Sequence, residues 1–216
     1  MLSFKKLGEL LFVPACPICR EPCKDAVCPD CKTKLEKKYL PLELYRKTMH
    51  FDFAMSAFSF EEPEVRSLVY CLKRRGWDNA VRLAGDILLD MIGTRSCFFD
   101  CEYLAFLPRS KEGIFSYGFD QARLLGEYVC NNSSLRLFDK LKRVGKSERQ
   151  KTLDRKSRFE NVKGKFICEE RVLGGSVILL DDMITSGASV NEGAAALITA
   201  GFDKVKVISL ASADKR

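Results

Sequence analysis

Apolar and polar residues alternate along the chain with different periods in different segments. Residues 51–60 alternate apolar residues with small or polar ones, which predicts a strand. Residues 63–75 and 78–93 are expected to form two helices divided by a glycine, the second with apolar residues at helical spacing. A short apolar run at 103–107 that stops at a proline predicts a buried strand. The first half therefore combines strands with helices.

The second half of the chain continues this alternation. Helices are expected at 120–130 and 190–200, and strands at 136–144, 166–168, 176–180 and 204–211. Two consecutive glycines before the third of these strands predict a turn. Strands that alternate with helices are typical of βαβ units around a parallel sheet, so we expect an α/β fold.

One basic segment accounts for the net charge of the chain, which is +7 over 216 residues. Between Arg136 and Lys165 there are twelve Lys and Arg residues against four Asp and Glu residues, a net charge of +8. We therefore expect an anionic partner at this segment, either a polyphosphate or a nucleic-acid backbone. Its second part, 145–165, contains few apolar residues and is predicted to be a mobile loop or arm.

Five of the ten cysteines are clustered near the N-terminus. Two C-x-x-C pairs, Cys16 with Cys19 and Cys28 with Cys31, are separated by eight residues. Four thiolates suit tetrahedral Zn²⁺, and four protein ligands leave no position open for a substrate, so we expect a structural zinc site. Replacement of one ligand by Cys23 is one alternative, and a redox role for either pair is the other.

The first residues loosely resemble a bacterial lipoprotein signal, because Lys5 and Lys6 precede the apolar stretch Leu7–Val13 and Cys16 follows it. The stretch is short and Glu9 interrupts it, so we do not expect export. No run of 18 apolar residues occurs in the sequence, so no membrane-spanning helix is expected. The expected location is cytoplasmic, where cysteines stay reduced.

The segment VILLDDMITSGASV, Val177–Val190, combines the features of a phosphate site. An apolar strand is expected to end at Asp181 and Asp182, and a short loop then leads into a helix. Ligands bind at the carboxyl ends of strands in open parallel sheets, and the first N–H groups of a helix suit phosphate. Gly187 lets the backbone approach an anion closely. Further hydroxyl donors are expected from Thr185, Ser186 and Ser189.

The two acids need a different partner, since carboxylates repel phosphate. Vicinal ribose hydroxyls are one option, and a Mg²⁺ ion that bridges the ligand is the other. The whole segment resembles the motif with which type I phosphoribosyltransferases bind phosphoribosyl pyrophosphate (PRPP): four apolar residues, two acids, two apolar residues and a Thr/Gly-rich loop.

Other segments resemble the competence protein F (ComF) family, so the resemblance spans nearly the whole chain. LAFLPR at Leu104–Arg109 and YGFDQA at Tyr117–Ala122 are similar to that family's P…R…GFNQA region, with Asp120 in place of Asn. LVYCLKRRG at Leu68–Gly76 resembles its LKY.G helix end, and the N-terminal cysteines match its zinc-binding start. The family's Q…L…R…N…G.F stretch is matched by Gln150, Leu153, Arg158, Asn161, Gly164 and Phe166.

The resemblance implies a type I phosphoribosyltransferase fold at residues 49–216, with a central parallel sheet flanked by helices. Residues 1–48 are expected to be a cysteine-rich zinc-knuckle module, and by elimination the N-terminal part of the chain supplies the hood over the PRPP site. The implied ligand contacts are ribose hydroxyls at Asp181 and Asp182, the 5′-phosphate at Thr185, Ser186, Gly187, Ala188 and Ser189, and pyrophosphate at Pro108, Arg109 and Ser110.

Transfer from PRPP breaks the bond between the anomeric carbon and pyrophosphate, which builds positive charge on the sugar and negative charge on the leaving group. Mg²⁺ and basic side chains stabilise that charge, and a mobile basic lid excludes water. The basic arm would sit where the family's mobile active-site loop sits. The catalytic candidates are therefore Arg143, Arg149 and Lys151, together with Arg109.

Two functions remain open at this point. One is Mg²⁺-dependent transfer of a phosphoribosyl group to a nitrogen nucleophile that the sequence does not name. The other is a non-catalytic role in natural transformation. In that role the zinc module and the basic arm bind single-stranded DNA for the DNA-uptake machinery, and the PRPP site is regulatory.

Overall fold

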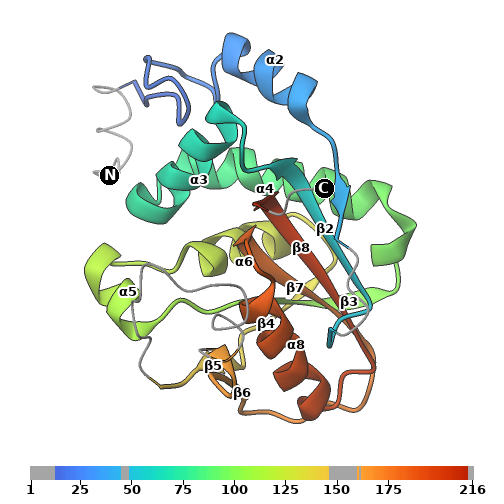
Figure 1. Ribbon diagram of the computed structural model, residues 1–216. Coiled ribbons are helices and arrows are strands. Elements are labelled where there is room, and N and C mark those ends of the chain that lie inside the picture. The colour runs from blue at the N-terminus through green and yellow to red at the C-terminus, as the bar shows by residue number, and fades with distance from the viewer. Residues whose placement is uncertain (1–12, 45–48, 146–159, 161, 214–216) are drawn as a thin grey trace, which may run out of the picture.

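The computed structural model describes residues 13–44, 49–145, 160 and 162–213 (Figure 1). Its helices are α2 (Pro29–Lys38), α3 (Pro63–Arg75), α4 (Asp78–Thr94), the 3₁₀ helix η1 (Ser96–Phe98), α5 (Lys111–Tyr117), α6 (Gln121–Asn131) and α8 (Ala188–Ala200). Its strands are β1 (Leu42–Glu43), β2 (Phe53–Ser59), β3 (Cys101–Phe106), β4 (Arg136–Phe138), β5 (Leu141–Arg143), β6 (Phe166–Cys168), β7 (Ser176–Ile184) and β8 (Lys204–Ser212). The protein is thus a mixed α/β structure, as expected from the sequence.

The central sheet has six strands in the order β1-β2-β8-β7-β3-β4. All neighbouring pairs are parallel except β1 with β2, which is antiparallel. A second, two-stranded sheet is formed by β5 and β6, which pair antiparallel. The predicted parallel sheet is therefore confirmed. The predicted domain boundary between residues 48 and 49 stays a prediction, and β1 hydrogen-bonds across it.

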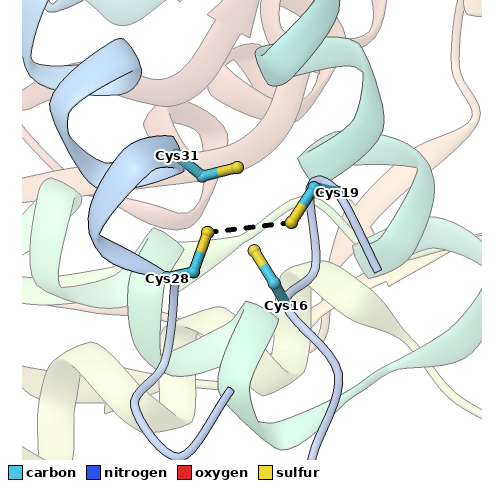
Figure 2. Close-up of side chains that lie close together, drawn as sticks. All are labelled: Cys16, Cys19, Cys28 and Cys31. Carbon is cyan, nitrogen blue, oxygen red and sulfur yellow. Dashed lines mark hydrogen bonds between the residues drawn. The ribbon is translucent and has the colours of Figure 1, made fainter. Parts of the chain in front are cut away.

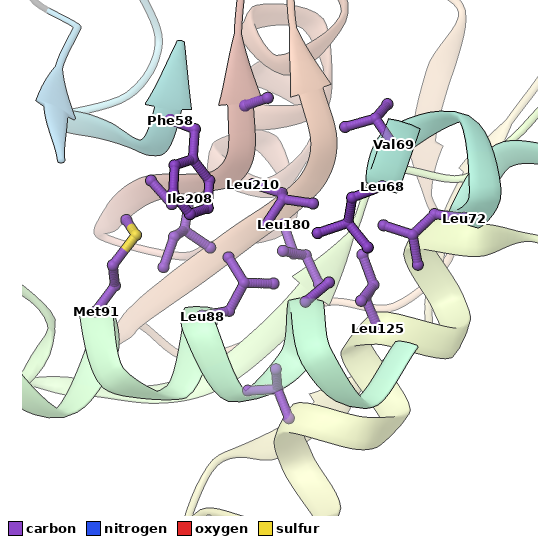
Figure 3. Packing of buried hydrophobic residues seen from close by; sticks show 14 of the residues in the cluster. Phe58, Leu68, Val69, Leu72, Leu88, Met91, Leu125, Leu180, Ile208 and Leu210 are labelled. Carbon is purple, nitrogen blue, oxygen red and sulfur yellow. The ribbon is translucent and has the colours of Figure 1, made fainter. Parts of the chain in front are cut away.

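Helices cover both faces of the sheet (Figure 1). The even-numbered residues Ile178 and Leu180 of β7 pack with α3, α4 and α6 in one core cluster, where Leu68, Leu88 and Leu125 are fully buried (Figure 3). Odd-numbered residues such as Leu179 pack with α8 and the small sheet in a second cluster. Successive side chains of a strand point to opposite faces, so strands that are apolar on both faces need a helical layer on each side.

Two strand predictions are corrected by the structure. The predicted strand 136–144 is two strands: β4 joins the central sheet beside β3, and the chain then turns at Asp139 and Lys140 so that β5 pairs with β6. The predicted strand 176–180 continues through both acids to Ile184, because β8 keeps pairing with it as far as Ser212. A change from apolar to polar residues shows where a strand leaves the core. It does not show where the hydrogen bonds with the neighbouring strand end.

None of the helices in the described part of the chain combines the length and the apolarity that crossing a bilayer requires. Three of the described helices, α2, α5 and the 3₁₀ helix η1, were not predicted. The residues of α2 are mostly charged, and α5 has only seven residues, so neither presents a long apolar stripe. The predicted arm at 145–165 lies mostly outside the described residues.

Candidate ligand site and candidate metal centre

The two acids lie at a step in the carboxyl edge of the sheet. The ladder between β3 and β7 ends at Leu180, whose carbonyl accepts a hydrogen bond from the Leu107 N–H (2.8 Å). The ladder between β7 and β8 continues to Ile184. Asp181 and Asp182 therefore stand beyond the end of the β3 ladder, on a part of β7 that pairs with β8.

Asp182 is buried among protein atoms and is paired with a cation from α3. Its side chain is 3% exposed, and Lys73 Nζ lies 3.3 Å from Asp182 Oδ2. That oxygen makes no hydrogen bond with any residue that the structure describes. Asp181 is half-buried, and its Oδ1 accepts a hydrogen bond from the Asp182 N–H (2.9 Å). Burial, and secondarily the negative charge of Asp182, raise the pKa of Asp181 well above its ordinary value, although Lys73 opposes this.

The loop after β7 turns directly into α8. Gly187 caps α8 with a left-handed backbone (φ 78°), a conformation that favours glycine because it has no Cβ. Ser186 Oγ accepts a hydrogen bond from the Ala188 N–H (3.4 Å), whereas Thr185 is exposed and Ser189 is half-buried. The first N–H groups of α8 thus lie just after the acids in sequence, as the motif predicts. The acids and residues 185–189 therefore follow one another at the end of β7 and the start of α8.

The predicted pyrophosphate turn, Pro108–Ser110, follows β3 and is held by buried contacts. The Arg109 N–H donates to Asp120 Oδ2 (2.7 Å), while the other oxygen of Asp120 caps α6. Ser110 caps α5 by accepting from the Gly113 N–H (3.1 Å). Asp120 accepts hydrogen bonds from three backbone N–H groups, those of Arg109, Ala122 and Arg123. A carboxylate can make these contacts, so they do not require the Asn of the ComF-like pattern.

The side chain of Arg109 is engaged with the protein. Its guanidinium donates to the backbone carbonyls of Phe119 (3.2 Å) and Lys73 (2.9 Å), and it stacks over the Tyr117 ring at 4.6 Å. These contacts tie the turn after β3 to the end of α3. A direct contact between Arg109 and pyrophosphate stays a prediction.

Of the four catalytic candidates, Arg109 and Arg143 lie within the described residues, and Arg143 lies on β5 close enough to Asp181 for their charges to interact. Burial lowers the pKa of Arg143, while the charge of Asp181 acts in the opposite direction. Its guanidinium lies 5.5 Å from the centre of the Phe166 ring, and its Nε is buried without a hydrogen-bond partner among residues 13–44, 49–145, 160 and 162–213. The other two candidates, Arg149 and Lys151, lie outside the described residues.

The four predicted metal ligands come together in space. The sulfur atoms of Cys16, Cys19, Cys28 and Cys31 all lie within 4.8 Å of one another, and those of Cys19 and Cys28 are 3.7 Å apart (Figure 2). A tetrahedral Zn²⁺ with Zn–S bonds of about 2.3 Å needs sulfur atoms about 3.8 Å apart. The cluster is therefore compatible with a structural zinc site.

Cys23 stands apart from this group. It is buried, and its thiol donates to the carbonyl of Asp25 (3.4 Å). Within the cluster, burial tends to raise the pKa of Cys16, but the backbone N–H groups of Cys28 and Cys19 outweigh it and lower the pKa to about 7. In the same cluster, burial and the neighbouring thiols of Cys28 and Cys19 raise the pKa of Cys31.

The cysteine module packs against α3 and α4. Asn79 of α4 donates to the carbonyl of Ala15 (2.7 Å), and Leu83 contacts the buried cysteines. Arg20 Nη1 donates to Cys71 Sγ of α3 (3.4 Å). Because Lys73 reaches Asp182 from the same helix, α3 lies between the module and the acids. A role of the module as hood over the ligand stays a prediction.

Comparison of the chain with models of known protein families finds no match, and comparison with curated proteins finds none either.

Two residues that hold the site together were missed from the sequence. Asp120 anchors the Arg109 turn, and a single Asp in the sequence gives no sign of such a contact. Lys73 pairs with Asp182, and the sequence of neighbouring basic residues does not show which of them faces the acids.

Proposed function

We propose that this chain binds PRPP at the step in the carboxyl edge of the sheet, as a phosphoribosyltransferase-like protein of the competence protein F family. The observation that carries the proposal is the position of Asp181 and Asp182 on the part of β7 that extends beyond β3, followed after a short loop by the N-terminus of α8. Helix N-termini favour phosphate, and carboxylates favour hydroxyls or Mg²⁺. A phosphorylated ribose carries both kinds of group.

In the proposed complex, residues 185–189 hold the 5′-phosphate and the two acids hold the ribose hydroxyls. The turn Pro108–Ser110 faces the pyrophosphate. The two acids supply carboxylate oxygen atoms of the kind that bind Mg²⁺, and one of these atoms, Asp182 Oδ2, is paired with Lys73 in this structure. Such an ion would neutralise negative charge on the pyrophosphate.

If the protein catalyses transfer, the bond between the anomeric carbon and pyrophosphate breaks, and pyrophosphate leaves with the electron pair. A nitrogen nucleophile forms the new bond to that carbon and loses its proton. The charges of Arg143 and Asp181 interact. In the proposed complex, Arg143 balances the negative charge of the acids and of the leaving pyrophosphate. We propose Arg149 and Lys151 as further cations of the same arm.

We also propose that the four-cysteine cluster binds Zn²⁺ as a structural ion. Its four sulfur ligands complete a tetrahedral shell without solvent, so the metal supplies stability and not catalysis. Cys31 lies in the first turn of α2, and Cys28 precedes that helix, so the metal would join α2 to the knuckle at Cys16 and Cys19.

Calorimetric titration with PRPP and Mg²⁺ tests the proposed ligand site. Wild-type protein should give saturable heat, and Asp181→Ala combined with Asp182→Ala should weaken binding at least tenfold. Asp139→Ala is a matched control, since Asp139 is exposed and lies outside the site. Absence of heat with folded wild-type protein would refute the ligand site.

A second candidate function, binding of single-stranded DNA, is favoured by one surface feature. The guanidinium of Arg74 lies 5.1 Å from the Tyr70 ring and 5.7 Å from the Tyr117 ring, and the neighbouring Phe115 is 92% exposed. Exposed aromatic rings alternating with arginines can stack on bases. In this candidate the PRPP site is regulatory and transfer does not occur.

Binding of oligothymidine at several salt concentrations tests this second candidate. Binding should fall steeply with salt, and Tyr70→Ala combined with Tyr117→Ala should weaken it. Phe99→Ala removes an exposed aromatic ring just before β3, at the amino end of that strand. It should have no effect on oligothymidine binding. A response that does not depend on salt, or equal loss in both variants, would exclude this surface.

A further inference from the structure

Lys73 is a partly exposed cation that pairs with the buried acid Asp182. Its side chain is 33% exposed, whereas that of its partner Asp182 is 3% exposed. The 3.3 Å contact is an ion pair without a hydrogen bond to Asp182 Oδ2. An ammonium group has three donors, so one contact of this kind leaves Lys73 able to bind a ligand that approaches from solvent.

The last turn of α3 is fixed from several sides, so Lys73 starts from a defined position. The carbonyl of Lys73 accepts from Arg109 Nη2 (2.9 Å), which joins it to the turn after β3. Gly76 ends the helix in the left-handed conformation, with its N–H donating to the carbonyl of Cys71. The thiol of Cys71 is in turn held by Arg20 of the cysteine module.

Arg20 itself adopts a positive φ of 73°, which is uncommon for a residue with a side chain. Glycine would fit this backbone without strain. The guanidinium of Arg20 contacts both Cys71 and the ring of Trp77, at 4.9 Å from the ring centre. At this strained position the arginine side chain makes contacts that glycine could not make. These contacts join the cysteine module to the end of α3.

The orientation of a bound ribose determines which of its groups would meet Lys73. With the 5′-phosphate at the start of α8 and the hydroxyls at the acids, the anomeric carbon points away from α8. The diphosphate on C1 and the CH₂ group on C4 that carries the 5′-phosphate are attached to the two carbons that flank the ring oxygen. The C1 group then faces the turn after β3 and the end of α3, where Lys73 lies.

We propose that Lys73 is a binding residue for the C1 diphosphate of PRPP, which it holds against Asp182. This inference rests on the proposed function and adds a residue to it. It also explains why the module, the end of α3 and the Arg109 turn are fastened together: the three fix the stem of the lysine that contacts the ligand.

The test compares PRPP with ribose 5-phosphate, which lacks the diphosphate, in calorimetric titrations with Mg²⁺ on the full chain. Lys73→Met should weaken PRPP binding at least tenfold and change ribose 5-phosphate binding less than threefold. Lys204→Met makes the same substitution at an exposed lysine at the start of β8, at the opposite edge of the sheet, and should change neither.

Equal loss for both ligands would overturn the assignment, because it would mean that Lys73 serves only to hold Asp182. Unchanged PRPP binding would overturn it as well. If wild-type protein binds neither ligand, the proposed function itself fails. Lys73→Gln, which keeps a donor beside Asp182, replaces Lys73→Met if circular dichroism shows that the latter is unfolded, and the same selective loss is expected.

Discussion

Substitution of Asp181 by Asn should stabilise the protein while removing a ligand contact. Burial and the neighbouring Asp182 raise the pKa of Asp181, so the folded state binds this proton more tightly than the unfolded chain does. Stability from this group is present at low pH and is lost as the pH rises above the ordinary pKa of Asp toward the raised value. Asn cannot ionise, so Asp181→Asn removes this loss.

The size of the effect follows from the charges around Asp181. Two like charges about 4 Å apart repel by about 4 kcal/mol at an effective dielectric constant of 20. Lys73 cancels part of this repulsion, and stabilising substitutions at functional sites typically gain about 0.5–2 kcal/mol. We expect a gain of about 1–2 kcal/mol at pH 8, which corresponds to a Tm increase of about 3–6 °C in a chain of this length.

Thermal unfolding at pH 4.5 and pH 8 checks this prediction. The gain should be larger at pH 8 than at pH 4.5. Asp139→Asn is the control: its hydrogen bond with Lys140 lowers the pKa of Asp139, so its carboxylate stabilises the fold above its ordinary pKa, and its loss should cost at most about 1 kcal/mol at pH 8. A lower Tm for Asp181→Asn at pH 8, or an equal shift at both pH values, would refute the reasoning.

Two further predictions concern the metal and the loop. Cys31→Ser should abolish stoichiometric zinc in metal analysis and lower the Tm. Cys23→Ser changes a cysteine outside the four-sulfur group and should retain zinc, so loss of zinc from both variants would contradict the proposed ligand set. Gly187→Ala places a Cβ at positive φ and should cost about 1–2 kcal/mol in denaturant unfolding, with weaker PRPP binding. Gly93→Ala in α4 meets open space and should be neutral or stabilising; equal loss in both variants would argue against backbone strain.

The layers of the fold could be predicted because burial leaves a pattern in the sequence. The strands around Leu180 are apolar on both faces, and the helices between them repeat apolar residues at helical spacing. The four metal ligands could be predicted because C-x-x-C spacing is a local property. The acids and Gly187 were found for the same reason, since one short segment carries them all.

Contacts between distant segments could not be predicted in this way. Lys73 and Asp182 are more than a hundred residues apart, and their contact depends on how α3 packs against the sheet. Several basic residues adjoin Lys73 in sequence, and only the rotation of the helix selects the one that reaches Asp182. The end of β7 was placed too early because its pairing with β8 leaves no signal in the polarity of β7.

Hydrogen–deuterium exchange with and without PRPP and Mg²⁺ tests the central claim most directly, because it reports where the ligand binds. The account predicts slower exchange in peptides that cover Asp181–Val190, with a smaller effect at Leu107–Lys111. Control peptides from the start of β8, at the opposite edge of the sheet, should exchange at the same rate in both conditions. Unchanged exchange at Asp181–Val190 under saturating PRPP, or protection confined to other segments, would contradict the account.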